Sequence, residues 1–106
     1  MNNDQATQKL LSMLSLARKA GKVISGADTC EKAIRNGKAL LVFAAADASA
    51  KTLKKFRDKT TFYNIPLSTA LTTQNLTQIG LDGRTIIAVT DQNFAKTMIQ
   101  GAESRA

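Results

Sequence analysis

Residues 23–47, VISGADTCEKAIRNGKALLVFAAAD, contain a short apolar run, a glycine, a helical pattern and a second apolar run in direct succession. Gly26 stands at the start of the predicted helix, where the lack of a side chain lets another molecule approach the backbone closely. The free N–H groups of a first helical turn attract anions such as phosphates. Asp28 and Thr29 can hydrogen-bond base edges, and Lys32, one turn further on, can reach a nucleic-acid backbone. The stretch therefore indicates nucleic-acid binding rather than chemistry.

Apolar periodicity on both sides of this stretch predicts helices that alternate with short strands. Cys30, Ala33 and Ile34 form the inward stripe of the helix that starts at the glycine, so the cysteine belongs to the core. Pro66 implies either a strand at the edge of the sheet or the start of a strand. The predicted helices cover residues 5–20, the segment from Gly26 to Asn36-Gly37, the segment capped by Ser49, residues 73–79 and the segment capped by Asp91; the predicted strands cover residues 23–25, 39–45, 65–67 and 85–90.

This alternation predicts an α/β fold, a three-layer α/β/α sandwich around a small mixed sheet of about four strands. With 106 residues, 43% of them hydrophobic, the chain is long enough for one core and too short for two ordinary domains. We expect one domain over residues 1–106 with a frayed tail from about 102. The four phenylalanines are expected on apolar faces and Tyr63 alone among the aromatics is expected to be exposed, which disfavours stacking platforms for single-stranded RNA. These phenylalanines are Phe43, Phe56, Phe62 and Phe94.

The net charge of +7 is concentrated in one half of the chain. Residues 9–59 hold twelve basic and four acidic residues, whereas residues 60–106 hold three of each. One basic surface on a neutral body favours a polyanionic partner. The alternative is that the lysines serve only to keep a small protein in solution.

Composition argues against metal, cofactor and catalytic functions. The chain has no histidine and one cysteine, so we expect no zinc site, no internal disulfide and no cofactor. Asp28 and Glu31 are the one close acidic pair available to an enzyme, and they lie on an exposed basic helix start. Asp47 ends a strand like the phosphoacceptor of a receiver domain, but the acidic pair expected after the first strand, Val23–Ser25, is missing. We therefore expect no enzyme.

Neither a membrane span nor a signal peptide is expected. No apolar run approaches the roughly 20 residues that cross a bilayer. Residues 1–4 lack the basic region and apolar stretch of a signal peptide. We expect a cytoplasmic location.

Four features in order along residues 10–98 resemble the kink-turn-binding ribosomal protein superfamily, the L-seven-Ae and L-thirty-e proteins, and within it the small bacterial YlxQ-type branch. They are the heptad Gly26 to Lys32, the strand Leu40 to Ala45 leading into Ala46-Asp47, the Ile65-Pro66 step and the ending Ala88-Val89-Thr90-Asp91. The family heptad reads Gly-x-Asn-Glu-x-x-Lys and grips tandem sheared G·A pairs in sharply bent RNA. The resemblance therefore implies RNA contacts from Gly26, Ala27, Asp28, Thr29 and Lys32.

Asp28 replaces the family asparagine and Thr29 replaces the glutamate. An ionised aspartate accepts hydrogen bonds but donates none, so Asp28 can take a bond from a base amino group but repels phosphate. The resemblance thus implies the family's binding mode and leaves the affinity and the target open.

The family's second RNA contact is a loop before the last strand, reading like Ser-Lys-x-x-Leu-Gly, which folds over an extruded nucleotide. It aligns with Thr72 to Thr77, where threonines replace the lysine and the glycine; this removes a phosphate partner and stiffens the loop. The loop after Asp47 faces this pocket in the family, and Ser49 stands where the family often has an acidic residue. The resemblance implies contacts from Thr72, Thr73, Gln74 and Asn75.

Residues and resemblance together predict a monomeric, non-catalytic protein that binds structured, kink-turn RNA as a ribosome-associated or RNA-folding factor. The alternative is a protein-interaction module that uses the basic third helix. The sequence does not identify the RNA.

Overall fold

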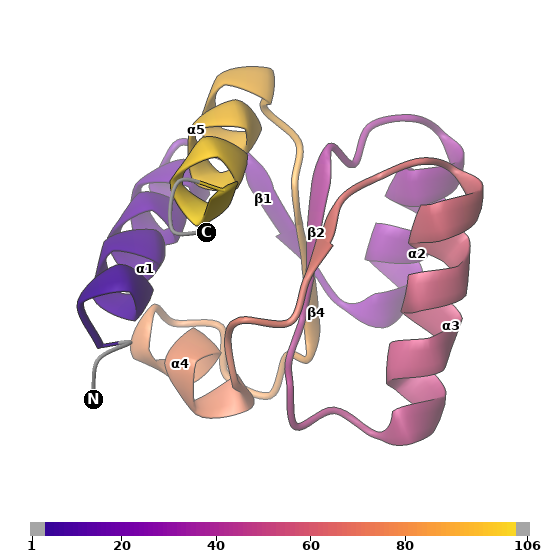
Figure 1. Ribbon diagram of the computed structural model, residues 1–106, viewed down its shortest axis with the longest axis horizontal. Coiled ribbons are helices and arrows are strands. Elements are labelled where there is room, and N and C mark those ends of the chain that lie inside the picture. The colour runs from indigo at the N-terminus through magenta and orange to yellow at the C-terminus, as the bar shows by residue number, and fades with distance from the viewer. Residues whose placement is uncertain (1–3, 104–106) are drawn as a thin grey trace.

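The computed structural model of the chain describes residues 4–103 as five helices and four strands (Figure 1). Their order is α1 (Asp4–Lys19), β1 (Val23–Ser25), α2 (Ala27–Arg35), β2 (Leu41–Ala44), α3 (Ala50–Phe62), β3 (Leu67–Ser68), α4 (Thr73–Gln78), β4 (Ile86–Val89) and α5 (Gln92–Glu103). The alternation of helices and strands predicted from periodicity is confirmed.

The four strands form one mixed sheet in the order β1-β4-β2-β3. β4 pairs antiparallel with both β1 and β2, whereas β2 pairs parallel with β3. Every residue of the two central strands is buried, because helices cover both faces of the sheet. β3 is an edge strand, one of the two positions that Pro66 implied, although it begins one residue after the proline, whose carbonyl accepts a bond of 3.0 Å from the Val42 N–H.

Helices α1, α4 and α5 cover one face of the sheet, and α2 and α3 cover the other, so the predicted three-layer sandwich is confirmed (Figure 1). Alternate residues of β2 point into separate cores: Phe43 packs with α1 and α5, and Val42 packs with α2 and α3. Cys30 and Phe56 belong to the second core and are almost completely buried, as predicted. Burial of each large apolar side chain stabilises the fold by about 1.5–3 kcal/mol.

Side-chain caps fix the starts of three helices, two of them predicted. The Ser49 hydroxyl accepts from the Thr52 N–H at 3.1 Å, and Asp91 accepts from the Phe94 N–H at 3.0 Å. Thr72 caps α4 in the same way. α5 extends to Glu103, and residues 104–106 of the expected tail lie outside the described residues. None of the described helices is both long and apolar enough to cross a membrane.

Phe62 is the one phenylalanine whose predicted environment is wrong. It is 79% exposed and packs edge-on against Tyr63, with ring centroids 4.9 Å apart. The inward positions of α3 are Leu53, Phe56 and Thr60, and position 62 lies on the outer side of the last turn. The Thr60 hydroxyl is satisfied within the helix, donating to the Phe56 carbonyl at 2.7 Å.

Candidate nucleic-acid interface

Gly26 joins β1 to α2 in a conformation that other residues rarely adopt. Its φ is 101° and its ψ 142°, in the region open almost only to glycine. Its N–H donates to the Ile86 carbonyl at 2.9 Å, and its carbonyl accepts from the Cys30 N–H at 3.0 Å. The same residue therefore completes the strand pairing with β4 and closes the first turn of α2.

The residues after Gly26 form the exposed first turn of α2. Ala27, Asp28 and Thr29 are all exposed, and Lys32 is exposed one turn further on, on the solvent side of the helix. Gly26 is the N-cap and has no side chain to accept from the first N–H groups. The predicted heptad is thus a helix start whose backbone donors can meet an anion.

The ends of four strands meet at this edge of the sheet. β1 and β2 both run antiparallel to β4, so their carboxyl ends lie beside its start, and the parallel strand β3 ends on the same side. The Ala45 N–H donates to the Thr85 carbonyl at 2.8 Å, and the Ala46 N–H donates to the Leu71 carbonyl at 2.8 Å. The topology therefore places the start of α2, the segment after β2 and the start of α4 along one edge.

Asp47 fixes the start of α4 against the end of β2. The Thr73 hydroxyl donates to one carboxylate oxygen at 2.6 Å, and the Thr73 N–H donates to the other at 2.9 Å. These two bonds hold the pKa of the Asp47 carboxyl below its ordinary value, and the bond from the Thr73 hydroxyl has the larger effect. Asp47 acts here as a second cap of α4.

Thr72 to Asn75 do not form the loop that the resemblance implied. Thr72 is the N-cap of α4: its hydroxyl accepts from the Asn75 N–H at 3.2 Å, and its own N–H donates to the Asn75 side chain at 2.9 Å. This capping box starts a helix, which confirms the helix predicted over residues 73–79 and shows that the loop implied by the resemblance was wrong here. Gln74 is the member of this segment that is exposed and makes no side-chain hydrogen bond within residues 4–103.

The loop that does approach the start of α2 carries Arg84, which the sequence did not single out. Arg84 is exposed just before β4, and a Cβ atom added to Gly26 would lie 3.2 Å from its Nη1. The pair Asp82-Gly83 is typical of a turn and precedes this strand, but the proximity of Arg84 to Gly26 depends on β1 pairing with β4. Arg84 supplies a positive charge beside the glycine junction.

Glu31 faces away from this edge and connects α2 to α3. Its carboxylate lies 3.3 Å from Arg35, 3.1 Å from Lys55 and 3.2 Å from Lys59. Hydrogen bonds from Lys55 and Lys59 lower the pKa of the Glu31 carboxyl, and the bond from Lys55 has the larger effect. Glu31 therefore forms ion pairs with three cations. It is not available as an acidic partner of Asp28 for acid–base chemistry.

No described cluster of three or more histidine, cysteine or acidic side chains within residues 4–103 could hold a metal ion. Cys30 is buried, and burial raises the pKa of its thiol to about 12, which keeps it protonated. The arrangement at this edge combines backbone donors, exposed polar groups and positive charge. It suits the binding of an anionic polymer.

Residues 8–99 match the model of the Ribosomal protein L7Ae/L30e/S12e/Gadd45 family. The chain is 37% identical over 94 residues to the RNA-binding protein YlxQ of Enterococcus faecium, covering 89% of this chain and 91% of that protein. It is 43% identical over 88 residues to the RNA-binding protein YlxQ of Bacillus subtilis (strain 168), covering 82% and 88%.

Solved structures share the fold. A protein of unknown function from Bacillus halodurans C superimposes with a TM-score of 0.85 at 34% identity, covering 90% of this chain and 97% of that one. The Giardia lamblia 15.5kD RNA binding protein superimposes with a TM-score of 0.81 at 17% identity, covering 98% and 92%. At that identity the second match speaks for the fold alone.

Proposed function

The chain belongs to the Ribosomal protein L7Ae/L30e/S12e/Gadd45 family, and we propose that it binds structured RNA at the edge of the sheet where α2 begins. The relatives named RNA-binding protein YlxQ support RNA as the partner. The basic first half of the chain supplies phosphate contacts, and the protein acts without catalysis.

The glycine junction is the observation that carries this proposal. Gly26 presents bare backbone at an uncapped helix start, with Asp28 and Thr29 exposed beside it and Lys32 within one turn. Arg84 adds a second cation from the facing loop. Backbone donors, base-edge partners and cations in one place are what recognition of a folded RNA strand needs.

We assign the RNA to the kink-turn class on the position of the heptad Gly26 to Lys32. Asp28 and Thr29 stand where the family contacts sheared G·A pairs, and Asp28 accepts from a base amino group. At the α4 end, Thr73 is held by Asp47, so Gln74 is the exposed member of residues 72–75 that we expect to meet a nucleotide, whereas Arg84 would act beside Gly26. The protein works as a cytoplasmic monomer, as a ribosome-associated or RNA-folding factor.

The alternative of a protein-binding site on α3 has weaker support. Lys55 and Lys59 pair with Glu31, and Lys54 pairs with Asp58 at 2.8 Å. Three of the five cations of this helix therefore already form ion pairs within the protein.

The test compares two RNAs in a direct binding titration. One folds into a kink-turn, and the other is identical except that Watson–Crick pairs replace the sheared G·A pairs. We expect the protein to bind the kinked RNA more tightly, because only that RNA presents the exposed base edges to Asp28 and Thr29. Equal affinity for both would overturn the kink-turn assignment and leave a nonspecific basic surface.

A further inference from the structure

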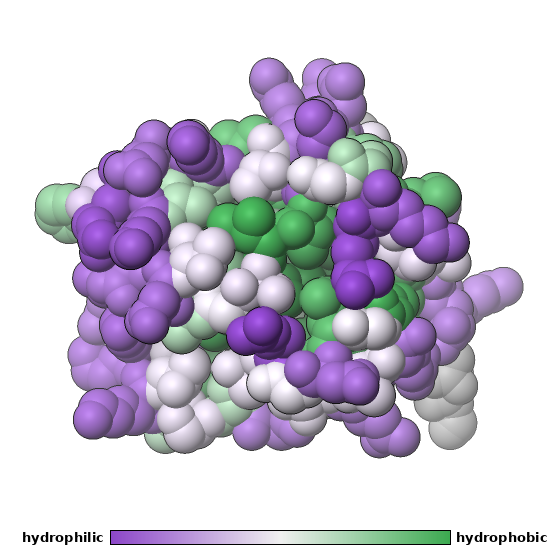
Figure 2. All heavy atoms as spheres, turned by 180° about the vertical axis from the view of Figure 1, so that it is seen from behind, coloured by the Kyte–Doolittle hydropathy of each residue, from purple (hydrophilic) through white to green (hydrophobic). Residues whose placement is uncertain are grey.

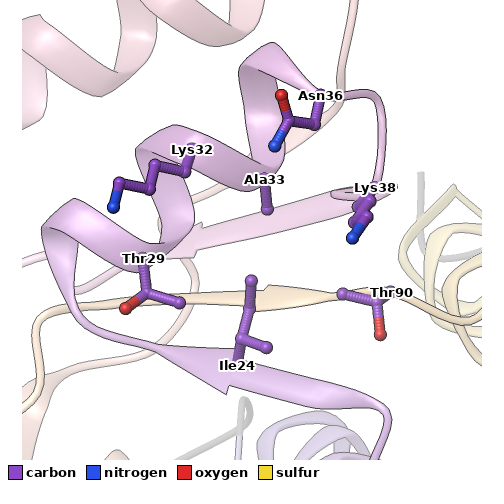
Figure 3. A pocket seen from close by; sticks show the side chains of 7 residues that line it. All are labelled: Ile24, Thr29, Lys32, Ala33, Asn36, Lys38 and Thr90. Carbon is purple, nitrogen blue, oxygen red and sulfur yellow. The ribbon is translucent and has the colours of Figure 1, made fainter.

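A groove of about 390 Å³ lies between α2 and the edge strand β1 (Figure 3). One wall is a single face of α2, whose contributing residues are spaced as i, i+3, i+4 and i+7. Both elements lie toward the rear of Figure 1, and the rear face shows hydrophobic surface bordered by hydrophilic side chains (Figure 2). The lining residues are Ile24, Thr29, Lys32, Ala33, Asn36, Lys38 and Thr90.

The groove continues from the start of α2. Thr29 lies at the end nearest the glycine junction, and Lys38 and Thr90 lie at the opposite end (Figure 3). Thr29 and Lys32 thus belong both to the groove and to the interface proposed above. A strand of RNA that contacts the first turn of α2 has the groove as its continuation along the same helix.

The chemistry of the lining combines apolar surface with unmatched positive charge. Ile24 and Ala33 contribute apolar groups, and no acidic residue is among the lining side chains. Lys32 and Lys38 are exposed and form no ion pair within residues 4–103. The cations on the other side of α2 differ, because Glu31 holds them. The positive potential on this side is therefore available to a ligand.

A nucleotide matches this combination of groups and this size. A base has an apolar face, its sugar and edges take hydrogen bonds, and its phosphate pairs with lysine. The volume lies near the lower end of the roughly 300–1,000 Å³ range of small-ligand pockets, which suits a single nucleotide unit. The Asn36 amide and the Thr29 hydroxyl are polar partners within the lining, and the Thr90 hydroxyl, which donates to the Lys22 carbonyl at 3.2 Å, can still accept a hydrogen bond.

We propose that the α2–β1 groove holds a nucleotide of the bound RNA beyond its kinked segment, with the base against Ile24 and Ala33 and the phosphates against Lys32 and Lys38. This inference rests on the proposed function, since the RNA must first dock at the start of α2. It extends the contact surface from the glycine junction to the far end of the helix.

The test uses Lys38→Ala, because this lysine belongs to the groove and not to the heptad. Its matched control is Lys96→Ala, an equal loss of charge at an exposed position of α5. For the kinked RNA with single-stranded extensions at both ends, we expect Lys38→Ala to bind several-fold more weakly. Its salt dependence should be shallower by about 0.7–0.9 in the log–log slope. Its preference over the Watson–Crick RNA should persist.

The outcomes separate this inference from the proposed function. If the wild type prefers the kinked RNA but Lys38→Ala behaves like Lys96→Ala, the groove inference fails and the proposed function stands. If the wild type shows no preference, the proposed function fails. Extensions that carry 4-thiouridine should crosslink to the peptide containing Asn36 or Thr90. Amide shifts at these residues from an oligoglutamate peptide, without crosslinks to RNA, would overturn the inference in favour of a protein ligand.

Discussion

Gly26 meets two separate requirements at one residue. Its φ of 101° is a conformation that a residue with a side chain adopts at a cost of about 1–3 kcal/mol. Its missing side chain also leaves room for the Arg84 guanidinium, whose Nη1 would lie 3.2 Å from an added Cβ atom. The first requirement concerns stability, and the second concerns the surface that an RNA would touch.

Substitution of Gly26 by valine separates these requirements. We expect Gly26→Val to lose about 1–3 kcal/mol of unfolding free energy and to lose its preference for kinked RNA while most molecules remain folded. The added side chain would stand between the backbone and the RNA and would displace Arg84. Thermal unfolding and RNA affinity should be measured on the same preparation. The affinity should be measured at a temperature well below the melting transition.

The matched control is Gly21→Val, at a glycine with φ of 75° whose added Cβ atom would meet no atom within 4 Å. It also carries backbone strain from a positive φ, in the turn after α1. We expect a loss of stability with the RNA preference intact. If both variants lose RNA binding in proportion to unfolding, Gly26 matters for the backbone alone.

At the scale of the element, α2 presents two faces of different character. Glu31 turns toward α3 and joins Arg35, Lys55 and Lys59, whereas Lys32 faces the groove beside β1. The network offsets repulsion among cations on two packed helices. It therefore helps fix the position of the helix whose first turn forms the candidate interface.

Glu31→Gln should lower the melting temperature at neutral pH by leaving three cations without their carboxylate. The folded-state pKa of Glu31 lies below its ordinary value of 4.5, so its contribution is present above pH 4.5 and is lost as the pH falls through the folded-state pKa. The difference between wild type and variant should therefore shrink in acid. Circular dichroism melts across this pH range measure it.

Asp58→Asn is the control for this prediction. Asp58 pairs with Lys54 on the exposed surface of α3, and both side chains are more than half exposed. Exposed pairs of this kind contribute little to stability. A melting temperature for Glu31→Gln equal to that of Asp58→Asn would show that the network does not hold the two helices together.

The elements themselves could be predicted because their signals are local. Apolar spacing identified α1 and α2, and Ser49 and Asp91 marked helix starts by the capping bonds that they accept. The pairing of β1 with β4 is not local, and the position of Arg84 beside Gly26 follows from it. The helix over residues 73–79 was predicted, but the capping box of Thr72 and Asn75 at its start was not.

At the scale of the molecule, the sheet edge gathers segments that are far apart in the sequence. The start of α2, the end of β2 and the loop before β4 meet there, although residues 26 and 84 are separated by most of the chain. Eight of the twelve basic residues in the first half lie on α2, on α3 or just after α2. The proposed reading of base edges and the binding of phosphates by this charge can be measured separately.

The dependence of RNA affinity on salt concentration distinguishes phosphate binding from the reading of base edges. Each phosphate neutralised by the protein releases counterions, so RNA affinity should fall steeply with salt, with a log–log slope of about −0.7 to −0.9 per contact. The base-edge contacts proposed for Asp28 and Thr29 would release no counterions, so the ratio of affinities for the kinked and Watson–Crick RNAs should stay nearly constant as both affinities fall. Titrations of both RNAs at several salt concentrations give the slope and the ratio together. A flat slope would contradict the role of the basic surface, whereas a ratio that falls to one at physiological salt would show that phosphates alone produce the preference.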